Sequence, residues 1–444
     1  VDCDWSSDVC SSDLEGLRYN PAQSADRLPL VTRPRLSFLR IGFSMPHIPA
    51  SSALSRFRVL DLTRVRAGPT CVKQFADFGA DVIKIETPPE AERNDGMTGD
   101  RHSFDMQNLH RNKRSMTLNL KDPRGLEIFM KMVKNADVVA ENYRPDVKYR
   151  LGIDYESLKK VNKGIVLASI SGFGQDGPYA KRPGFARIFE SMSGFTQICG
   201  EEDGRPLHLG YPISDAVAGL FGATGVLAAL VDLARHPERR GQEIDCSATE
   251  AMLRTLEFLA IEYDQLGAVR TRSGNRSQYA APGNVYQTAD GKWASIAAST
   301  QSIFERLCTA LNLRDLLEDE RFATNPARVR NYKALDVIVG GAIARLSLAD
   351  LRECFAKHEV GFSPIYDIAD VFDDPQIRAR QAIVTVPDSE LGPVRMQGVV
   401  PRFSETPGRV RQAGPAIGEH NREVYEALGL TPAELDALKA RKII

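Results

Sequence analysis

The residue best placed for chemistry is an aspartate at the expected start of a helix. Asp215 directly precedes a stretch rich in Gly and Ala, residues 216–233, which we expect to be a tightly packed core helix rather than a membrane span. A helix N-terminus offers unpaired N–H groups and positive dipole charge, which favour an ionised carboxylate and a developing anion. Asp215 therefore suits a nucleophile, although on this pattern alone Ser214-Asp215 is more simply interpreted as a helix N-cap.

The sequence lacks the common catalytic and metal-binding motifs. It contains no GxGxxG or GxxxxGK[ST] phosphate loop, no GxSxG and no HExxH. The seven histidines do not fall at metal-ligand spacing, so we expect no metal site. The cysteines show neither zinc-site nor disulfide spacing. Five of them lie among apolar neighbours and are interpreted as reduced thiols, which suits a cytoplasmic protein. These five are Cys71, Cys199, Cys246, Cys308 and Cys354.

Length and composition indicate a soluble enzyme. The chain has 444 residues, of which 43% are hydrophobic and 26% charged, and its net charge is -1. A balanced charge gives no reason to expect a nucleic-acid or membrane partner. Any anionic ligand must therefore be bound by local Lys and Arg side chains and backbone N–H groups.

Short apolar runs alternate with helical patterns through the first half of the chain. Helices are expected between them. Asp122 as N-cap and Pro123 in the first turn start one of these helices, and Asp154 caps a shorter one that runs through Leu158. This alternation predicts a large, doubly wound, Rossmann-like α/β domain with a parallel sheet. The expected strands are 57–63, 80–86, 115–120, 136–141 and 165–171.

The remainder of the chain divides into segments of different character. We expect residues 1–44 to be a non-native or disordered extension, with Met45 as the natural start, and residues 45–266 to be the first part of the large domain. Residues 267–346, beginning with a polar stretch and a hairpin at 284–297, are expected to form a smaller inserted α+β domain. Residues 347–444 are helical again and are expected to return to the large domain.

An ordered series of segments resembles the class III CoA-transferases of the CaiB/BaiF type, which include the formyl-CoA and carnitine CoA-transferases. The series runs from about residue 56 to the C-terminus, and its order makes the resemblance specific. The segments are VLDLTRVRAGP (59–69), GADVIKIE (79–86), NKRSMTLNLKDPRG (112–125), ADVVAENYRPDV (136–147), RLGIDYESL (150–158), SGFGQDGPYAKRPGF (171–185), SDAVAGLFGATGVLAAL (214–230) and GEHNREVYEALGLTPAEL (418–435).

The resemblance implies a reaction and a catalytic residue. Asp215 matches the family's catalytic aspartate. In the family this aspartate forms first an aspartyl anhydride and then an aspartyl-CoA thioester, as CoA moves from an acyl-CoA to a carboxylic acid. It also implies an interlocked homodimer, with acyl-CoA and small carboxylates as substrates and no tightly bound cofactor. The stretch 187–195 is similar to members that use succinyl-CoA and short dicarboxylates. The implied CoA-binding residues are Arg66, Lys121, Asn142 and Arg150, and the expected residues of the substrate pocket are Arg187 and His208.

Some positions depart from the family's patterns. Thr87 stands where formyl-CoA transferases place a basic residue near the nucleotide, and the glycine-rich loop over the aspartate is reduced to Ser273-Gly274-Asn275. Two alternatives share the fold: a 2-methylacyl-CoA racemase or epimerase, and an inactive CoA-binding member. A racemase needs two opposed acid/base groups, and this chain has Phe185 where racemases carry histidine. The presence of Asp215 argues against an inactive member.

Overall fold

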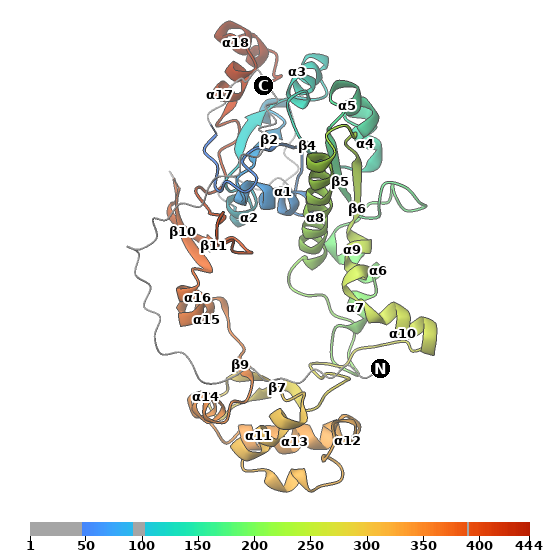
Figure 1. The fold of residues 1–444 in the computed structure, drawn as a ribbon, viewed down its shortest axis with the longest axis vertical. Coiled ribbons are helices and arrows are strands. Elements are labelled where there is room, and N and C mark those ends of the chain that lie inside the picture. The colour runs from blue at the N-terminus through green and yellow to red at the C-terminus, as the bar shows by residue number, and fades with distance from the viewer. Residues whose placement is uncertain (1–46, 92–102, 389) are drawn as a thin grey trace, which may run out of the picture. The chain divides into compact units, whose positions relative to one another are not determined.

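A six-stranded parallel sheet forms the centre of the large α/β part (Figure 1). The computed structural model describes residues 47–91, 103–388 and 390–444, so the predicted extension, 1–44, lies outside the described residues. The strand order is β3-β2-β1-β4-β5-β6, the order of a doubly wound sheet, so the predicted fold class is confirmed. The strands are β1 (Arg58–Asp61), β2 (Asp81–Glu86), β3 (Arg114–Thr117), β4 (Val138–Glu141), β5 (Val166–Ser171) and β6 (Glu243–Ser247).

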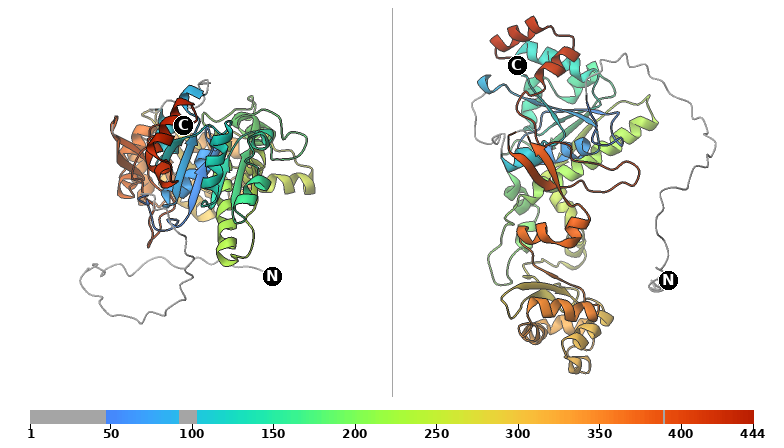
Figure 2. Two further views of the ribbon diagram at one scale, coloured as in Figure 1. Left: turned by 90° about the horizontal axis from the view of Figure 1, so that it is seen from above. Right: turned by 90° about the vertical axis from the view of Figure 1, so that its left-hand side faces the viewer.

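Helices cover both faces of this sheet because successive side chains of each strand point to opposite sides (Figures 1 and 2). Leu60 lies in one core with α3 (Pro123–Val133), α5 (Tyr155–Val161), α17 (Asn421–Ala427) and α18 (Pro432–Ala440). Val59 lies in the other core with α1 (Ala67–Asp77), α8 (Ile213–Arg235) and α9 (Ala248–Thr255). The shorter helices of this part are α2 (Phe104–Leu109), α4 (Pro145–Leu151), α6 (Ala186–Met192), α7 (Phe195–Ile198) and α10 (Phe258–Leu266), with a 3-10 turn, η1 (Pro89–Ala91).

The predicted starts of two helices are confirmed by their caps. The Asp122 carboxylate accepts a hydrogen bond from the Arg124 N–H at 2.8 Å, and Pro123 occupies the first turn of α3. Asp154 caps α5 by accepting from the Ser157 N–H at 3.1 Å. These caps fix where the chain turns back after β3 and before β5.

Helix α8 packs closely on α1 through small residues. A Cβ at Gly219 would lie 2.7 Å from the Ala67 carbonyl oxygen, so no larger residue fits at this crossing without movement. Among the described residues α8 is the one helix long and apolar enough to cross a membrane, a property it shares with core helices of soluble proteins. Its packing against α1, α9, β5 and β6 agrees with the prediction of a core helix.

A separate hydrophobic core lies within residues 281–362, which follow α10. Its three-stranded sheet contains β7 (Gly283–Gln287), β8 (Trp293–Ala297) and β9 (Phe362–Pro364); the first two form the predicted hairpin. Leu351 and Phe355 lie in this core too, so residues 348–364 pack here. This differs from the expectation that residues 347–444 return to the large domain. The division into domains otherwise stays a prediction. The helices are α11 (Gln301–Ala310), η2 (Arg314–Leu317), α12 (Asn325–Arg330), α13 (Tyr332–Ile343) and α14 (Leu348–Lys357).

The end of the chain returns to the edge of the large sheet. Asn421 accepts a hydrogen bond from the Thr117 N–H on β3 at 2.8 Å, and Tyr425 is buried against the same strand. Before this return, a two-stranded antiparallel sheet that the sequence patterns did not predict pairs Ile383 with Gln397. Its strands are β10 (Ile383–Asp388) and β11 (Gly392–Gln397), preceded by α15 (Ile368–Asp373) and α16 (Pro375–Ala379).

Candidate active site

Two cavities lie where the sheet reverses its strand order, between β1 and β4. Ligands of doubly wound folds bind at this point, outside the carboxyl ends of the strands. The larger cavity has a volume of about 780 Å³ and the smaller about 230 Å³. Tyr143, which follows β4, lines both of them, so they adjoin at this side chain. A long ligand can therefore occupy the larger cavity and present one end in the smaller.

The smaller cavity contains Asp215 on the first turn of α8. The helix begins at Ile213 and its N-cap is Pro212, so the interpretation of Ser214-Asp215 as an N-cap is wrong. None of the residues that the structure describes donates a hydrogen bond to the Asp215 carboxylate. Burial raises the Asp215 pKa to about 6. The charge of Arg66 opposes this rise, and the charge of Glu190 adds to it. The result is an unencumbered carboxylate of raised basicity at a helix N-terminus.

Arg66 and Asn142 line the same cavity as Asp215 but have different contacts. Arg66 forms an ion pair with Asp105 and lies over the Tyr211 ring, 5.3 Å from its centre. Asn142 accepts a hydrogen bond from the Arg64 N–H at 2.7 Å and donates to the Arg64 carbonyl oxygen at 2.8 Å. Asn142 therefore ties the loop after β4 to the loop after β1, and its side-chain amide is already engaged.

Buried charges hold the loop after β1 from beneath. Asp61 is fully buried; it accepts hydrogen bonds from the N–H and hydroxyl of Thr63 and pairs with Lys113 at 2.8 Å. Lys84 donates to the Thr63 carbonyl oxygen at 3.2 Å. Burial alone would raise the Asp61 pKa, but the charges of Lys113 and Lys84 outweigh it and hold this pKa below its ordinary value. The backbone that carries Arg64 and Arg66 is thus fixed by a charged network.

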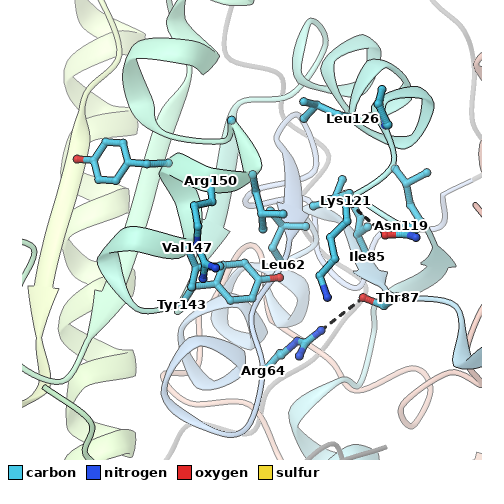
Figure 3. A pocket seen from close by; sticks show the side chains of 16 residues that line it. Leu62, Arg64, Ile85, Thr87, Asn119, Lys121, Leu126, Tyr143, Val147 and Arg150 are labelled. Carbon is cyan, nitrogen blue, oxygen red and sulfur yellow. Dashed lines mark hydrogen bonds between the residues drawn. The ribbon is translucent and has the colours of Figure 1, made fainter. Parts of the chain in front are cut away.

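Basic side chains from three elements line the larger cavity. Lys121 and Arg150, both predicted as CoA-binding residues, lie there, and Arg64 joins them. Arg64 donates a hydrogen bond to the Thr87 hydroxyl at 3.5 Å, and Figure 3 shows Lys121 and Arg64 extending toward the same region. Arg64 therefore brings a positive charge beside Thr87, the position where the formyl-CoA transferase pattern has a basic residue. Its place two residues before Arg66, in the same loop, is the signal that could have identified it.

The two residues expected in the substrate pocket lie elsewhere. Arg187 is exposed on α6 and lines neither cavity, because α6 turns its buried face, with Phe189 and Glu190, toward α8. His208 precedes α8, with its Nδ1 3.5 Å from a buried carboxylate oxygen of Glu190. The arginines besides Arg66 that line the smaller cavity come from loops, where sequence periodicity gives no signal: Arg144 and Arg182.

The smaller cavity lacks the second acid/base group of a racemase. Phe185 lines it at the position where racemases carry histidine, and the cavity wall also includes Phe189. Among the described residues that line this cavity, Asp215 is the one carboxylate and there is no histidine. The described residues also contain no cluster of His, Cys, Asp and Glu side chains suited to a metal ion. One carboxylate among arginines and aromatic rings suits nucleophilic acyl transfer better than two-base proton exchange.

The loop at Ser273-Gly274-Asn275 is engaged with another part of the chain. The Gly274 N–H donates to the Gly200 carbonyl oxygen at 3.0 Å, and a Cβ at Gly274 would lie 3.0 Å from a Glu201 carboxylate oxygen. Gly274 also has a φ of +59°, which a glycine adopts without strain. These contacts fix the loop beside residues 200–201, and it does not line either cavity.

Comparison with known proteins places the chain in one enzyme family. Residues 54–421 match CoA-transferase family III. The chain is 38% identical over 399 residues to the succinyl-CoA–D-citramalate CoA-transferase of Chloroflexus aurantiacus, covering 88% of this chain and 98% of the relative. It is 35% identical to the succinate–glutarate CoA-transferase of Agrobacterium fabrum, covering 84% and 95%. The chain belongs to CoA-transferase family III.

A solved structure shares the fold. A CAIB/BAIF family protein from Brucella suis superposes with a TM-score of 0.75 and is 33% identical, covering 85% of this chain and all of that one. The expected family, fold class and enzyme class are thus confirmed, and the protein is a CoA-transferase. The roles of the individual site residues stay predictions.

Proposed function

We propose that this protein transfers CoA from succinyl-CoA to a small dicarboxylic acid, with Asp215 as the nucleophile. The observation that carries this proposal is the unencumbered Asp215 carboxylate in a small cavity that adjoins a larger, basic one. Relatives named for succinyl-CoA and for citramalate or glutarate support the substrate class. Free cysteines throughout the described residues support a cytoplasmic location.

The chemistry follows from the charge of one side chain. An Asp215 oxygen attacks the thioester carbonyl carbon, the C–S bond breaks, and CoA leaves as a thiolate with the electron pair. The thiolate then attacks the aspartyl carbonyl of the anhydride, which releases the first acid and leaves an aspartyl-CoA thioester. The second acid reverses these steps and departs as its CoA thioester. Phe185 and Phe189 line the cavity and help to exclude water, which would hydrolyse each intermediate.

The reaction is tested directly by supplying succinyl-CoA with a panel of small carboxylic acids and measuring new acyl-CoA species by mass spectrometry. We expect wild-type protein to form acyl-CoA from at least one dicarboxylic acid, and Asp215→Ala protein to form none. If wild-type protein instead exchanged the α-proton of a 2-methylacyl-CoA and formed no new acyl-CoA, it would be a racemase and the proposed function would be wrong.

CoA phosphates are expected to bind in the larger cavity. Replacing Lys121 or Arg150 by Ala removes a charge-assisted hydrogen bond, so we expect the KM for succinyl-CoA to rise about tenfold to a hundredfold per residue. The kcat should change little because these groups bind donor and transition state alike. Arg378→Ala on α16, outside both cavities, is the matched control. Unchanged KM values in both cavity variants would contradict this placement.

The distal carboxylate of a dicarboxylic substrate is expected to pair with Arg182 in the smaller cavity. Arg182 lies over the Tyr179 ring at 5.3 Å, and a guanidinium suits planar, two-point binding of a carboxylate. Arg182→Ala should raise the KM for dicarboxylic acids at least about tenfold and affect monocarboxylic acids little. Arg187→Ala is the control, since Arg187 lines neither cavity. The opposite ranking of the two variants would restore Arg187 as the substrate-binding residue.

Exposed apolar surface supports assembly into the interlocked homodimer that the family resemblance implies. Ile261 and Leu266 on α10 are 67% and 76% exposed, and Leu220 and Val231 on α8 are 52% and 58% exposed. A stable monomer rarely leaves so many large side chains in water along two helices. We expect light scattering to give twice the mass of one chain. A mass of one chain at micromolar concentration would exclude the dimer.

A further inference from the structure

A buried carboxylate with one oxygen that has no hydrogen-bond partner among the described residues lies next to the helix turn that carries the nucleophile. The Glu190 side chain on α6 is fully buried, and its Oε2 has no hydrogen-bond partner among the described residues. Its Oε1 accepts a long hydrogen bond, 3.4 Å, from the N–H of Ser214, the residue next to Asp215. Buried carboxylates are normally fully hydrogen-bonded, so an exception requires an explanation.

The surroundings of Glu190 connect it to the start of α8. The Ser214 hydroxyl donates to the Ala186 carbonyl oxygen at 3.0 Å, which joins the first turn of α8 to the first turn of α6. The ring nitrogen Nδ1 of His208 lies 3.5 Å from the Glu190 Oε2 and 3.4 Å from the Thr196 hydroxyl. The Glu190 carboxylate thus lies between the nucleophile's helix turn and the loop that leads into it.

We propose that Glu190 is a positioning residue for the nucleophile: it holds the first turn of α8 and keeps a second negative charge beside the Asp215 carboxylate. Burial is the largest cause of the raised Asp215 pKa; Arg66 lowers this pKa, and Glu190 raises it further. This inference rests on the proposed role of Asp215 and extends it to a residue that lines neither cavity.

The second charge favours acyl transfer for a simple electrostatic reason. In the first step the Asp215 oxygen forms a bond to the thioester carbon, and its negative charge leaves with the electron pair of the broken C–S bond. A neighbouring negative charge destabilises the ionised Asp215 but not the neutral acylated form. It also makes the carboxylate more basic and therefore more nucleophilic, while a pKa near 6 still leaves it ionised at neutral pH.

Among the residues that the structure describes, the charged groups that act on this pair come from identified elements. Arg66 faces Asp215 from the loop before α1, and His208 faces Glu190 from the loop before α8. The Cys199 thiol, just after α7, has a raised pKa through burial and the Glu190 charge. Helix α9, which also packs on α6 and α8, buries uncharged residues only: Ala248, Ala251 and Met252.

The test replaces the charge and keeps the shape. In Glu190→Gln protein the amide oxygen can still accept from the Ser214 N–H, so the helix start is retained while the negative charge is lost. We expect the acidic limb of the kcat/KM profile, near pH 6 in wild type, to move to lower pH. At pH 8 kcat should fall about threefold to tenfold, with little change in the KM for succinyl-CoA. Glu190→Ala also removes the contact to Ser214 and should lower kcat further.

Two controls make the result decisive. Because the His208 Nδ1 lies 3.5 Å from the Glu190 Oε2, the Glu190→Gln comparison is repeated in a His208→Gln background, where the same shift of the limb is expected. A second measurement needs no turnover. It compares how the free energy of unfolding varies with pH in wild-type and Asp215→Asn proteins, and again in the same two proteins carrying Glu190→Gln. An unchanged acidic limb together with an unchanged Asp215 pKa in this readout would overturn the proposal. Absence of transferase activity in wild type would instead count against the proposed function.

Discussion

Asp215→Asn protein is expected to fold normally and to lose CoA transfer by at least about 10⁴-fold, the scale of losing a covalent nucleophile. The amide keeps the shape of the side chain but is too weak a nucleophile to attack a thioester. No other carboxylate among the described residues lines the smaller cavity, so none is placed to substitute. The measurement is the rate of acyl-CoA formation from succinyl-CoA. More than about 1% of wild-type activity would contradict the assigned role.

The same substitution is expected to stabilise the fold at pH 8. The folded-state pKa of Asp215, about 6, lies above its ordinary value of 3.8, so the folded protein favours the neutral acid. Below pH 3.8 this preference has no effect on stability; as pH rises to about 6, the wild type loses stability that Asp215→Asn retains. Two pKa units correspond to about 3 kcal/mol at most, which partial exposure reduces to about 1–2 kcal/mol. Equal urea stabilities at pH 8 would show that Asp215 is not held at this raised pKa.

Lys113→Met is expected to lower the free energy of unfolding by about 3–5 kcal/mol, because it leaves the Asp61 carboxylate buried without its partner. Lys84 remains nearby but binds the Thr63 carbonyl oxygen, so it compensates only in part. The loss should also loosen the loop that carries Arg64 and Arg66 and raise the KM for succinyl-CoA. Urea unfolding with an unchanged m-value measures the first effect.

A double variant distinguishes an unpaired charge from lost packing. In Asp61→Asn/Lys113→Met protein the Asn oxygen can still accept from the N–H and hydroxyl of Thr63, but no buried charge is left unpaired. We expect this protein to recover at least half of the stability that Lys113→Met loses. If the double variant were no more stable than Lys113→Met alone, the ion pair would not be the source of the loss.

Regular elements with strong periodicity were predictable from the sequence. The run 57–63 contains β1, and Asp122 and Asp154 cap helices at the predicted positions. Strand–helix alternation is enough to predict a parallel doubly wound sheet, and with it the edge where ligands bind. The predicted position of Asp215 at a helix N-terminus was correct to within one turn, although the helix begins earlier, at Ile213.

The contacts that build the site could not be predicted because they join residues far apart in the sequence. Asn142 binds the backbone of Arg64 across 78 residues, and Glu190 binds the Ser214 N–H across 24. Arg182 lines the smaller cavity and Arg187 does not, a distinction set by the loop before α6 and by which face of this helix is buried. Such details depend on loop geometry, for which the sequence carries little local signal.

The most direct test of the account is to mix wild-type protein with succinyl-CoA alone, quench in acid and measure the intact mass. We expect a species heavier than the protein by one CoA less one water, mapped by peptide analysis to Asp215 and lost on treatment with hydroxylamine. Asp215→Asn protein should show no such species. An adduct on a different residue, or rapid CoA transfer to an added acid with no adduct at any quench time, would contradict an aspartyl-CoA intermediate at Asp215.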